Sequence, residues 1–231
     1  GDDAVKRAEV RKIVQEQFEL YGLEPAETPT IEFEEFVKGE EEREDVVSEI
    51  FKLEDRGKRK LSLKYESTFQ LKRIAKNQKL PYKVYQISRV FRDEPTSSNR
   101  LREFTQGDAD IVGSSPNDET EFFSLVKSIL DRLGIKSTIY INNRKLLNEI
   151  LVSENIKEKY QDNVIQELDK LDKLPKKKVA DNLKKFGAEK ILKIFDGNEK
   201  DFEKYNFYKE IKELKKLCKF YGVKVEFRAN L

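Results

Sequence analysis

The segment 102–110 carries polar, charged or aromatic side chains at every second position, and Arg92, Glu94 and Arg100 stand just upstream of it. Arginine offers forked donors suited to phosphate oxygens, an aromatic ring can stack on a base, and carboxylates with an amide oxygen can hold an ammonium group. Together these chemistries suit a nucleotide bound beside an amino acid. The alternating residues are Arg102, Phe104, Gln106, Asp108 and Asp110.

Two strands joined by a polar loop would bring these side chains together. Residues 85–94 alternate like a strand until Pro95, and the cluster at 96–99 then favours a loop. A second strand through 102–110 puts alternate side chains on one face, which Arg92 and Glu94 can join if the strands pair. Unpaired buried charge is costly, so such a face needs water or a polar ligand. A solvated hairpin with exposed ion pairs is the alternative.

Composition excludes several other chemistries. The 231 residues contain 46 Lys and Arg against 44 Asp and Glu, so no net basic field indicates nucleic-acid binding, although local lysine runs remain candidates. The lone Cys218 excludes an internal disulfide and a cysteine metal cluster, and a chain without histidine cannot use a histidine triad. The sequence has no apolar run of membrane-spanning length and no signal-peptide pattern, so we expect no membrane partner and a cytoplasmic protein.

Periodicity predicts an α+β fold, an antiparallel sheet flanked by helices, followed by a mainly helical region from Arg144 onward. Gly22 is expected to end the first helix, and Ser67 is a candidate cap for the helix expected at 67–77. The expected helices are 4–21, 67–77 and 117–133, the expected strands are 30–33, 50–53, 60–63, 137–142 and 223–227, and 34–45 is expected to be an acidic connector.

The hairpin resembles motif 2 of the class II aminoacyl-tRNA synthetases, and in detail that of the histidyl-tRNA synthetase family. The matching pattern is F-R-D-E, a short polar loop, R-x-R-E-F-x-Q and an acidic position before I-V-G. Three more stretches follow in the family's order and extend the resemblance over nearly the whole chain, with the closest likeness to the archaeal and eukaryotic form. They are Gly22–Glu35, which resembles motif 1 with Pro29 in the motif's proline position, Leu63–Thr68, which resembles the amino-acid-binding loop before motif 2, and Ile141–Arg144, which resembles the strand after motif 2.

The resemblance implies activation of histidine by ATP with Mg²⁺, and transfer of the histidyl group to tRNA(His). It implies a catalytic role for Arg92, which would hold the α-phosphate and the substrate carboxylate. Glu94 would lie near the adenine amino group, and the ring of Phe104 would stack on the adenine. Arg100 and Arg102 would reach the triphosphate. The positions matching the family's cluster around the substrate α-amino group are Glu66, Thr68, Gln106 and Asp110. No protein metal ligand and no role for Asp108 follow from it.

The resemblance also implies an organisation: a catalytic core with motifs 1 and 2 at 1–145, a helical insertion and returning helix at 146–222, and the next core strand from 223–231. In class II enzymes motif 1 forms a dimer interface, which implies a homodimer through 4–21 and 30–33; an ordinary core helix is the alternative. Lys176–Lys178 could touch tRNA phosphates or simply be a solvated helix start.

The sequence departs from the family pattern in ways that bear on activity. Pro95 follows Glu94 directly where relatives often have an arginine, the R-G-x-R-D opening is absent, and Arg228 stands where an acidic residue is common. The R-G-L-D-Y-Y type loop and motif 3 are not among the 231 residues, so we expect an incomplete core that alone is weakly active or inactive. A non-catalytic regulatory module that binds tRNA, histidine or a protein, and a structural dimerisation fragment, remain open.

Overall fold

The structure is a computed structural model that describes residues 1–38, 48–98 and 100–229. The chain divides into two compact units, Gly1–Ile135 and Lys136–Leu231, each with its own hydrophobic core. Of the helices that the structure describes, none is long and apolar enough to cross a bilayer.

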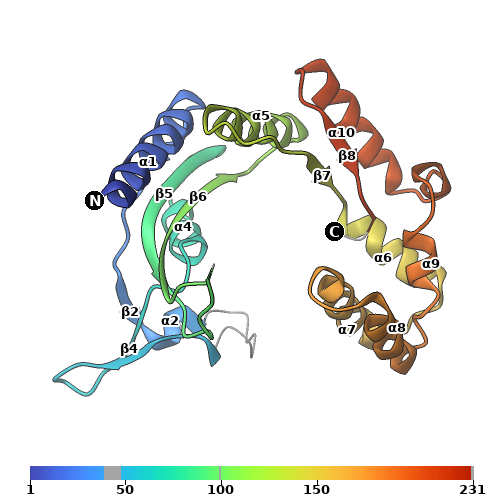
Figure 1. Cartoon of the computed structure of the whole chain (residues 1–231), viewed down its shortest axis with the longest axis horizontal. Coiled ribbons are helices and arrows are strands. Elements are labelled where there is room, and N and C mark those ends of the chain that lie inside the picture. Colours follow the sequence, from blue (N-terminus) through green and yellow to red (C-terminus); the bar gives the residue numbers. More distant parts are fainter. Residues whose placement is uncertain (39–47, 99, 230–231) are drawn as a thin grey trace. The chain divides into compact units, whose positions relative to one another are not determined.

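A long antiparallel hairpin organises the first unit. It consists of β5 (Tyr82–Phe91) and β6 (Glu103–Val112), which curve together through the unit (Figure 1). Val90 pairs with Phe104 and Ser88 with Gln106, so the even-numbered residues of both strands share one face. Beyond the strand end, the Arg92 amide donates to the Arg102 carbonyl over 2.9 Å, which extends this register. The predicted hairpin and its polar face are therefore confirmed.

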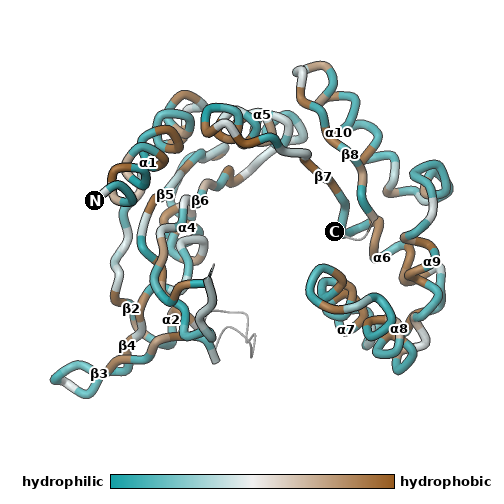
Figure 2. Tube along the Cα trace, in the orientation of Figure 1, coloured by the Kyte–Doolittle hydropathy of each residue, from teal (hydrophilic) through white to brown (hydrophobic). Residues whose placement is uncertain are grey.

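The odd-numbered face is packed against α1 (Asp2–Leu20) and α5 (Pro116–Arg132). Phe18, Tyr85 and Leu125 are buried in this core, and the rings of Phe18 and Tyr85 lie 5.1 Å apart. Hydrophobic and hydrophilic positions alternate from turn to turn along α1 (Figure 2). Gly22 follows α1 with a φ of 76°, a conformation that glycine adopts readily, and this confirms the predicted helix end.

A second sheet has the order β2-β4-β3 and is antiparallel, as expected for the strands predicted at 50–53 and 60–63. Its strands are β2 (Ile31–Phe33), β3 (Lys52–Glu54) and β4 (Lys60–Leu63). The expected acidic connector is partly wrong, because α2 (Glu34–Lys38) is a short helix that buries Val37 against Ile50. The rest of that connector, residues 39–45, lies outside the described residues.

The helix α4 (Thr68–Ala75) contacts β6 of the hairpin and buries Leu71 and Ala75. Ser67 occupies its N-cap position but makes no side-chain cap hydrogen bond, so the predicted cap is wrong. Ser67 is fully buried, and its Oγ lies 3.2 Å from Ser88 Oγ, a hydrogen bond in which either hydroxyl can donate. A buried hydroxyl takes the partner within reach, here a strand side chain rather than the helix end.

The second unit is mainly helical, as predicted. Its helices are α6 (Arg144–Ser153), α7 (Glu158–Leu168), α8 (Lys176–Leu183), α9 (Ile191–Phe195) and α10 (Tyr208–Phe220), with 3₁₀ turns at Asp169–Asp172, Lys184–Phe186 and Glu199–Phe202. Their core centres on Leu151, Val164 and Ile191.

Parallel pairing occurs at two places where the sequence predicted antiparallel sheet. In the first unit the short β1 (Glu24–Pro25) joins β5 in parallel. In the second, β7 (Ile139–Ile141) pairs in parallel with β8 (Val225–Phe227). The helices α6 to α10 therefore form an excursion between two neighbouring strands, an arrangement that connected parallel strands require.

Candidate active site

Arg92 lies between two aromatic rings at the end of the hairpin. Its guanidinium carbon is 4.6 Å from the ring centroid of Tyr65 and 5.3 Å from that of Phe104. Arg92 Nε is buried and has no hydrogen-bond partner among the described residues. Cation–π contacts fix the guanidinium without using its in-plane N–H donors. Those donors can therefore turn to an anionic ligand.

Tyr65 was not anticipated as a site residue. Its hydroxyl donates to Glu49 Oε2 over 2.9 Å, and the Phe91 amide donates to the Lys64 carbonyl over 2.8 Å, so the ring is tied to the hairpin end from both sides. Burial, helped by the hydrogen bond to Glu49, raises the pKa of Tyr65 to about 12. The phenol thus remains a neutral donor. The sequence signal was an aromatic residue directly before Glu66, but its partner lies far along the chain.

The other end of the polar face is acidic. Thr68 Oγ1, in the first turn of α4, donates to Asp108 Oδ2 over 2.8 Å. Gln106 Oε1 and Asp110 Oδ2 are buried and have no hydrogen-bond partner in the described part of the chain. Burial raises the pKa of Asp110, the nearby Asp108 raises it further, and Lys72 opposes both. Two buried acceptors beside a carboxylate pair suit a ligand that brings N–H donors and positive charge.

Buried polar atoms without partners concentrate on this face. Among the described residues they occur on Arg92, Gln106 and Asp110, and otherwise on Ser62 and Ser137. Each unsatisfied buried group costs about 1–3 kcal/mol, so a cluster of them is expected where a ligand completes the hydrogen bonds. A donor at one end and acceptors at the other fit a ligand that is anionic at one end and carries an ammonium at the other.

Glu94, Arg100 and Arg102 lie at the more open edge of the site. Arg100 Nη1 donates to Glu94 Oε2 over 3.2 Å, and Arg102 Nε lies 3.7 Å from Asp93 Oδ1. Both arginine side chains are more than half exposed, at 56% and 57%. These ion pairs are solvent-screened and weak, so a phosphate could displace them at small cost.

Glu66 is half-buried in the loop before α4, two residues from Thr68. The structure thus gathers its neighbour Thr68 with Asp108, and Arg92 with Phe104, while the roles given to all of these residues remain predictions. Within the described ranges, no group of three or more His, Cys, Asp or Glu residues is placed to hold a metal ion.

An arginine packed beside an aromatic ring on an antiparallel hairpin is the arrangement expected of a class II synthetase core. Solved structures share the fold of this chain. Histidyl-tRNA synthetase from Nostoc sp. PCC 7120 has a TM-score of 0.78 at 23% identity, covering 98% of this chain and 58% of its own. An "ATP phosphoribosyltransferase regulatory subunit/histidyl-tRNA synthetase" from Bacillus halodurans C has a TM-score of 0.85 at 19% identity, covering 100% of this chain and 65% of its own.

Sequence comparison is more specific than the fold. The profile of the family described as "Histidyl-tRNA synthetase" matches residues 2–222, and the chain belongs to that family. Histidine–tRNA ligase 1 of Bacillus anthracis is 39% identical over 182 residues, which are 75% of this chain and 42% of the relative. Histidine–tRNA ligase 2 of Shouchella clausii is 36% identical over 193 residues, 81% of this chain and 45% of the relative.

The chain thus spans less than half the length of these curated relatives. Both are bacterial proteins, and they give no support to the closer likeness to the archaeal and eukaryotic form that the motif pattern had led us to expect.

Proposed function

We propose that this chain is part of the catalytic domain of a histidine–tRNA ligase, which activates histidine with ATP and transfers it to tRNA(His). The observation that carries the proposal is the hairpin face itself, where a buried donor, Arg92 Nε, and two buried acceptors, Gln106 Oε1 and Asp110 Oδ2, find no hydrogen-bond partner among the residues that the structure describes. Family membership supports the same assignment. Protein synthesis in the cytoplasm is the setting that these substrates imply.

In the proposed reaction a histidine carboxylate oxygen attacks the α-phosphorus of ATP. The bond from that phosphorus to the β-phosphate bridging oxygen breaks, and pyrophosphate leaves with the electron pair. Arg92 would neutralise the α-phosphate and align the attacking carboxylate, while Phe104 stacks on the adenine and Glu94 accepts from its amino group. Positioning and charge neutralisation can carry such a step without a protein nucleophile.

The acidic end would hold the substrate α-ammonium group. Asp110 and Gln106 would accept hydrogen bonds from its N–H groups, with Glu66 and Thr68 completing the cluster. Arg100 and Arg102 would exchange their exposed carboxylate partners for phosphate oxygens. Mg²⁺ enters this proposal on the phosphates of ATP, as is usual for this ion, which binds through one or two carboxylates and substrate phosphates rather than in a protein cage.

The proposed organisation is a core with motifs 1 and 2 at 1–145, an insertion and returning helix at 146–222, and the resuming core strand at 223–231. The parallel pairing of β7 with β8 supports it, because the chain returns beside the strand from which the helices depart. Since the chain covers 42% of a relative, the complete reaction is proposed for a polypeptide that supplies the rest of the family's catalytic domain.

Histidine-dependent exchange of pyrophosphate into ATP tests this function. Residues 1–231 alone are expected to exchange slowly, and addition in trans of the remaining catalytic part of a family member is expected to raise the rate. No exchange under either condition, from a chain that nevertheless binds Mg²⁺–ATP and histidine, would reject catalysis.

A non-catalytic regulatory module is the second candidate, and one comparison favours it specifically. The solved structure with a TM-score of 0.85 names a regulatory subunit beside histidyl-tRNA synthetase in its description. Such a module would bind histidine at the acidic end of the face without activating it. Binding of histidine without pyrophosphate exchange would favour the regulatory module over the catalytic domain. A chain that binds neither histidine nor Mg²⁺–ATP would have only a structural role.

We also propose a homodimer through β2 and α1. Strand β2 lies at the edge of its sheet, and its Ile31 and Phe33 are each 54% exposed. On α1, Val5 and Val10 are also exposed. Exposed apolar side chains on an open strand edge favour pairing, and a second copy is the symmetric partner.

Sedimentation at micromolar concentration is expected to show a dimer that Ile31→Ser with Phe33→Ser converts to monomer. The matched control is Val152→Ser, which removes an equally apolar, 63% exposed side chain from α6. A wild-type monomer, or a dimer that survives the double substitution, contradicts the proposed interface.

Tyr65 is expected to position Arg92. Tyr65→Leu removes the ring but keeps an apolar side chain, and loss of one cation–π contact of about 0.5–2 kcal/mol should weaken Mg²⁺–ATP binding by roughly 2- to 30-fold. Tyr65→Phe keeps the ring and loses only the bond to Glu49, so it should retain most of the affinity. Calorimetric titration measures both. Equal affinity in the Leu and Phe variants would show that the ring does not act through Arg92.

A further inference from the structure

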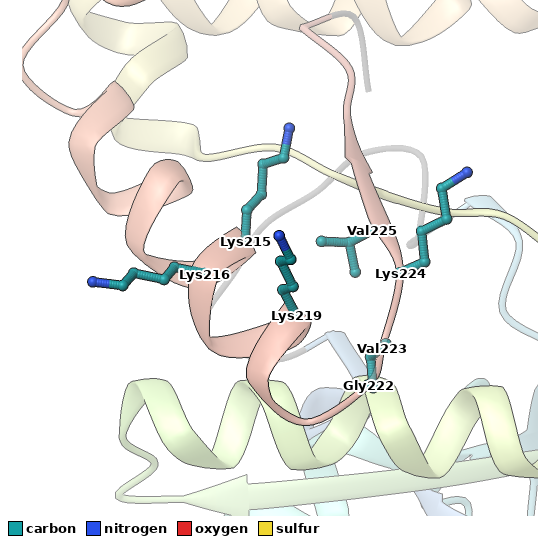
Figure 3. Close-up of a pocket in the computed structure, with 7 residues that line it drawn as sticks. All are labelled: Lys215, Lys216, Lys219, Gly222, Val223, Lys224 and Val225. Atoms are coloured by element: carbon teal, nitrogen blue, oxygen red, sulfur yellow. The ribbon is translucent and has the colours of Figure 1, made fainter.

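A buried lysine opens the segment 64–68, which contains Tyr65, Glu66 and Thr68 of the proposed site. Lys64 is 1% exposed, and it is the only buried lysine among the residues that the structure describes. Lysine normally keeps its ammonium group in water. The lysines that line a hollow beside the end of α10 follow this rule, and Figure 3 shows Lys216 extending away from that helix. The burial of Lys64 therefore requires a specific reason.

The ammonium group of Lys64 contacts neutral oxygens. Its Nζ donates to the Thr28 carbonyl over 3.0 Å and lies 3.5 Å from Ser88 Oγ, at the limit of hydrogen-bond length. Burial lowers the pKa of Lys64, and the negative charge of Glu32 opposes this shift. A buried charge that contacts only neutral groups is costly, and an apolar side chain would fill the same space without that cost. Packing alone does not explain a lysine at this position.

Ser88 connects Lys64 to the segment 64–68. Ser88 lies on the polar face of the hairpin, paired with Gln106, and its Oγ is 3.2 Å from Ser67 Oγ. A hydroxyl group can accept a hydrogen bond from an ammonium group and donate one to a second hydroxyl at the same time. Ser67 directly precedes Thr68, which donates to Asp108. Lys64 thus belongs to a hydrogen-bonded chain that ends beside the acidic end of the face.

Thr28 connects Lys64 to the elements on either side. Its carbonyl accepts from Lys64, and its Oγ1 lies 3.2 Å from Gln70 Oε1 in α4 and 2.9 Å from Gln86 Nε2 in β5. Gln70 Nε2 in turn donates to Glu32 Oε1 in β2 over 3.3 Å. Gln70, Gln86 and Glu32 are all buried. A satisfied buried network of this kind rigidifies the elements that it joins, here β2, β5 and α4.

We propose that Lys64 is a positioning residue for the end of the site that would hold the substrate amine. Its ammonium group fixes the segment 64–68 against β5, so that Thr68 meets Asp108. The other end of the site does not need this group, because the Phe91 amide donates to the backbone carbonyl of Lys64 over 2.8 Å. Loss of the ammonium group should therefore weaken amine binding and spare nucleotide binding. The ligand in this inference rests on the proposed function, whereas the placement of the segment does not.

Calorimetric titration with histidinol, an amine without a carboxylate, and with Mg²⁺–ATP tests the proposal. Lys64→Met keeps an unbranched side chain without charge, and it is expected to weaken histidinol binding at least about 10-fold and to leave Mg²⁺–ATP binding unchanged. Lys64→Arg keeps the charge and the donors, and it should retain most of the affinity for histidinol. The matched control is Lys60→Met, which removes the same charge from the exposed start of β4 and should change neither affinity.

Ser88→Ala provides a second variant that keeps Lys64 and removes its link to Ser67. It is expected to weaken histidinol binding by about 2- to 10-fold, and it decides the matter if Lys64→Met does not fold. Equal losses of histidinol and Mg²⁺–ATP affinity in Lys64→Met, or equal losses of histidinol affinity in the Met and Arg variants, would overturn the proposal. Wild-type histidinol affinity in Lys64→Met, or in Ser88→Ala where the Met variant does not fold, would do the same.

Hydrogen exchange of the ligand-free chain separates this proposal from the proposed function. The amides of residues 65–68 should exchange faster in Lys64→Met and Ser88→Ala than in the wild type and Lys60→Met. Unchanged exchange in these variants would overturn the positioning role. Faster exchange in a chain whose wild type does not bind histidinol would support the positioning role and reject the proposed ligand.

Discussion

Arg92→Ala is expected to lower the affinity of the chain for Mg²⁺–ATP by about 10- to 100-fold. A hydrogen bond to a charged group contributes about 1.5–3 kcal/mol, and Arg92 Nε is a buried donor without a partner in the described structure. The side chains that flank this guanidinium are the rings of Tyr65 and Phe104. Neither ring carries a positive charge that could replace the lost donor. In pyrophosphate exchange the loss should be larger, on the order of 10² to 10³, because charge builds up at the phosphate in the transition state.

Arg89→Ala is the matched control. Arg89 lies on the same strand but on the opposite face, is 72% exposed and pairs with Glu103. It therefore removes the same charge from the hairpin without touching the proposed site. Isothermal calorimetry compares the three proteins. Equal ATP affinity in wild type and Arg92→Ala, or an equal loss in Arg89→Ala, would mean that Arg92 does not hold the α-phosphate.

Asp110→Asn is expected to make the chain more stable and less able to bind the substrate amine. Burial and the neighbouring Asp108 disfavour the ionised form of Asp110, and its raised pKa means that ionisation of this carboxyl costs folding free energy. Asp110→Asn replaces the buried charge by a neutral amide of the same size, and a gain on the order of 1 kcal/mol raises Tm by about 2–4 °C in a domain of this size. Affinity for histidinol, which has the ammonium but no carboxylate, should fall at least about 10-fold.

The stability change caused by Asp110→Asn should depend on pH. The folded pKa of Asp110 lies above the ordinary value of 3.8, so its destabilising charge is fully present above the folded pKa. The stability gain of Asp110→Asn should therefore be largest at neutral pH and shrink as pH falls toward 3.8. Asp118 provides the opposite control, because hydrogen bonds from Ser115 lower its pKa. Asp118→Asn should destabilise the chain at neutral pH and lose this effect in acid. A lower Tm for Asp110→Asn at pH 7 would contradict the assignment.

Local pattern predicted the central hairpin well because its signals are local. Alternation through 85–94 and 102–110 determined both strands and the shared face, and Gly22 marked the helix end that its positive φ confirms. Charge on a strand face is rarely accidental, since the cost of burial restricts it to sites with partners. The polar face could therefore be located before its geometry was known.

Contacts between distant segments could not be predicted in the same way. Tyr65 meets Arg92 and Thr68 meets Asp108 only because the sheets pack together, and no spacing rule links these positions. Ser67 had the right position for a cap but found Ser88 instead. The parallel partner of β7 lies beyond the whole helical excursion, so its choice depends on how those helices close.

A titration with a non-hydrolysable histidyl-adenylate analogue tests the central claim most directly, because this ligand presents the ammonium, the adenine and a stable phosphate mimic at once. We expect one bound analogue per chain, with binding weakened at least about 10-fold by Arg92→Ala at one end of the face and by Asp110→Asn at the other, and unchanged by Arg89→Ala. Failure of the wild-type chain to bind the analogue, or equal binding by all four proteins, would contradict the assignment of this hairpin face as the site of histidine activation.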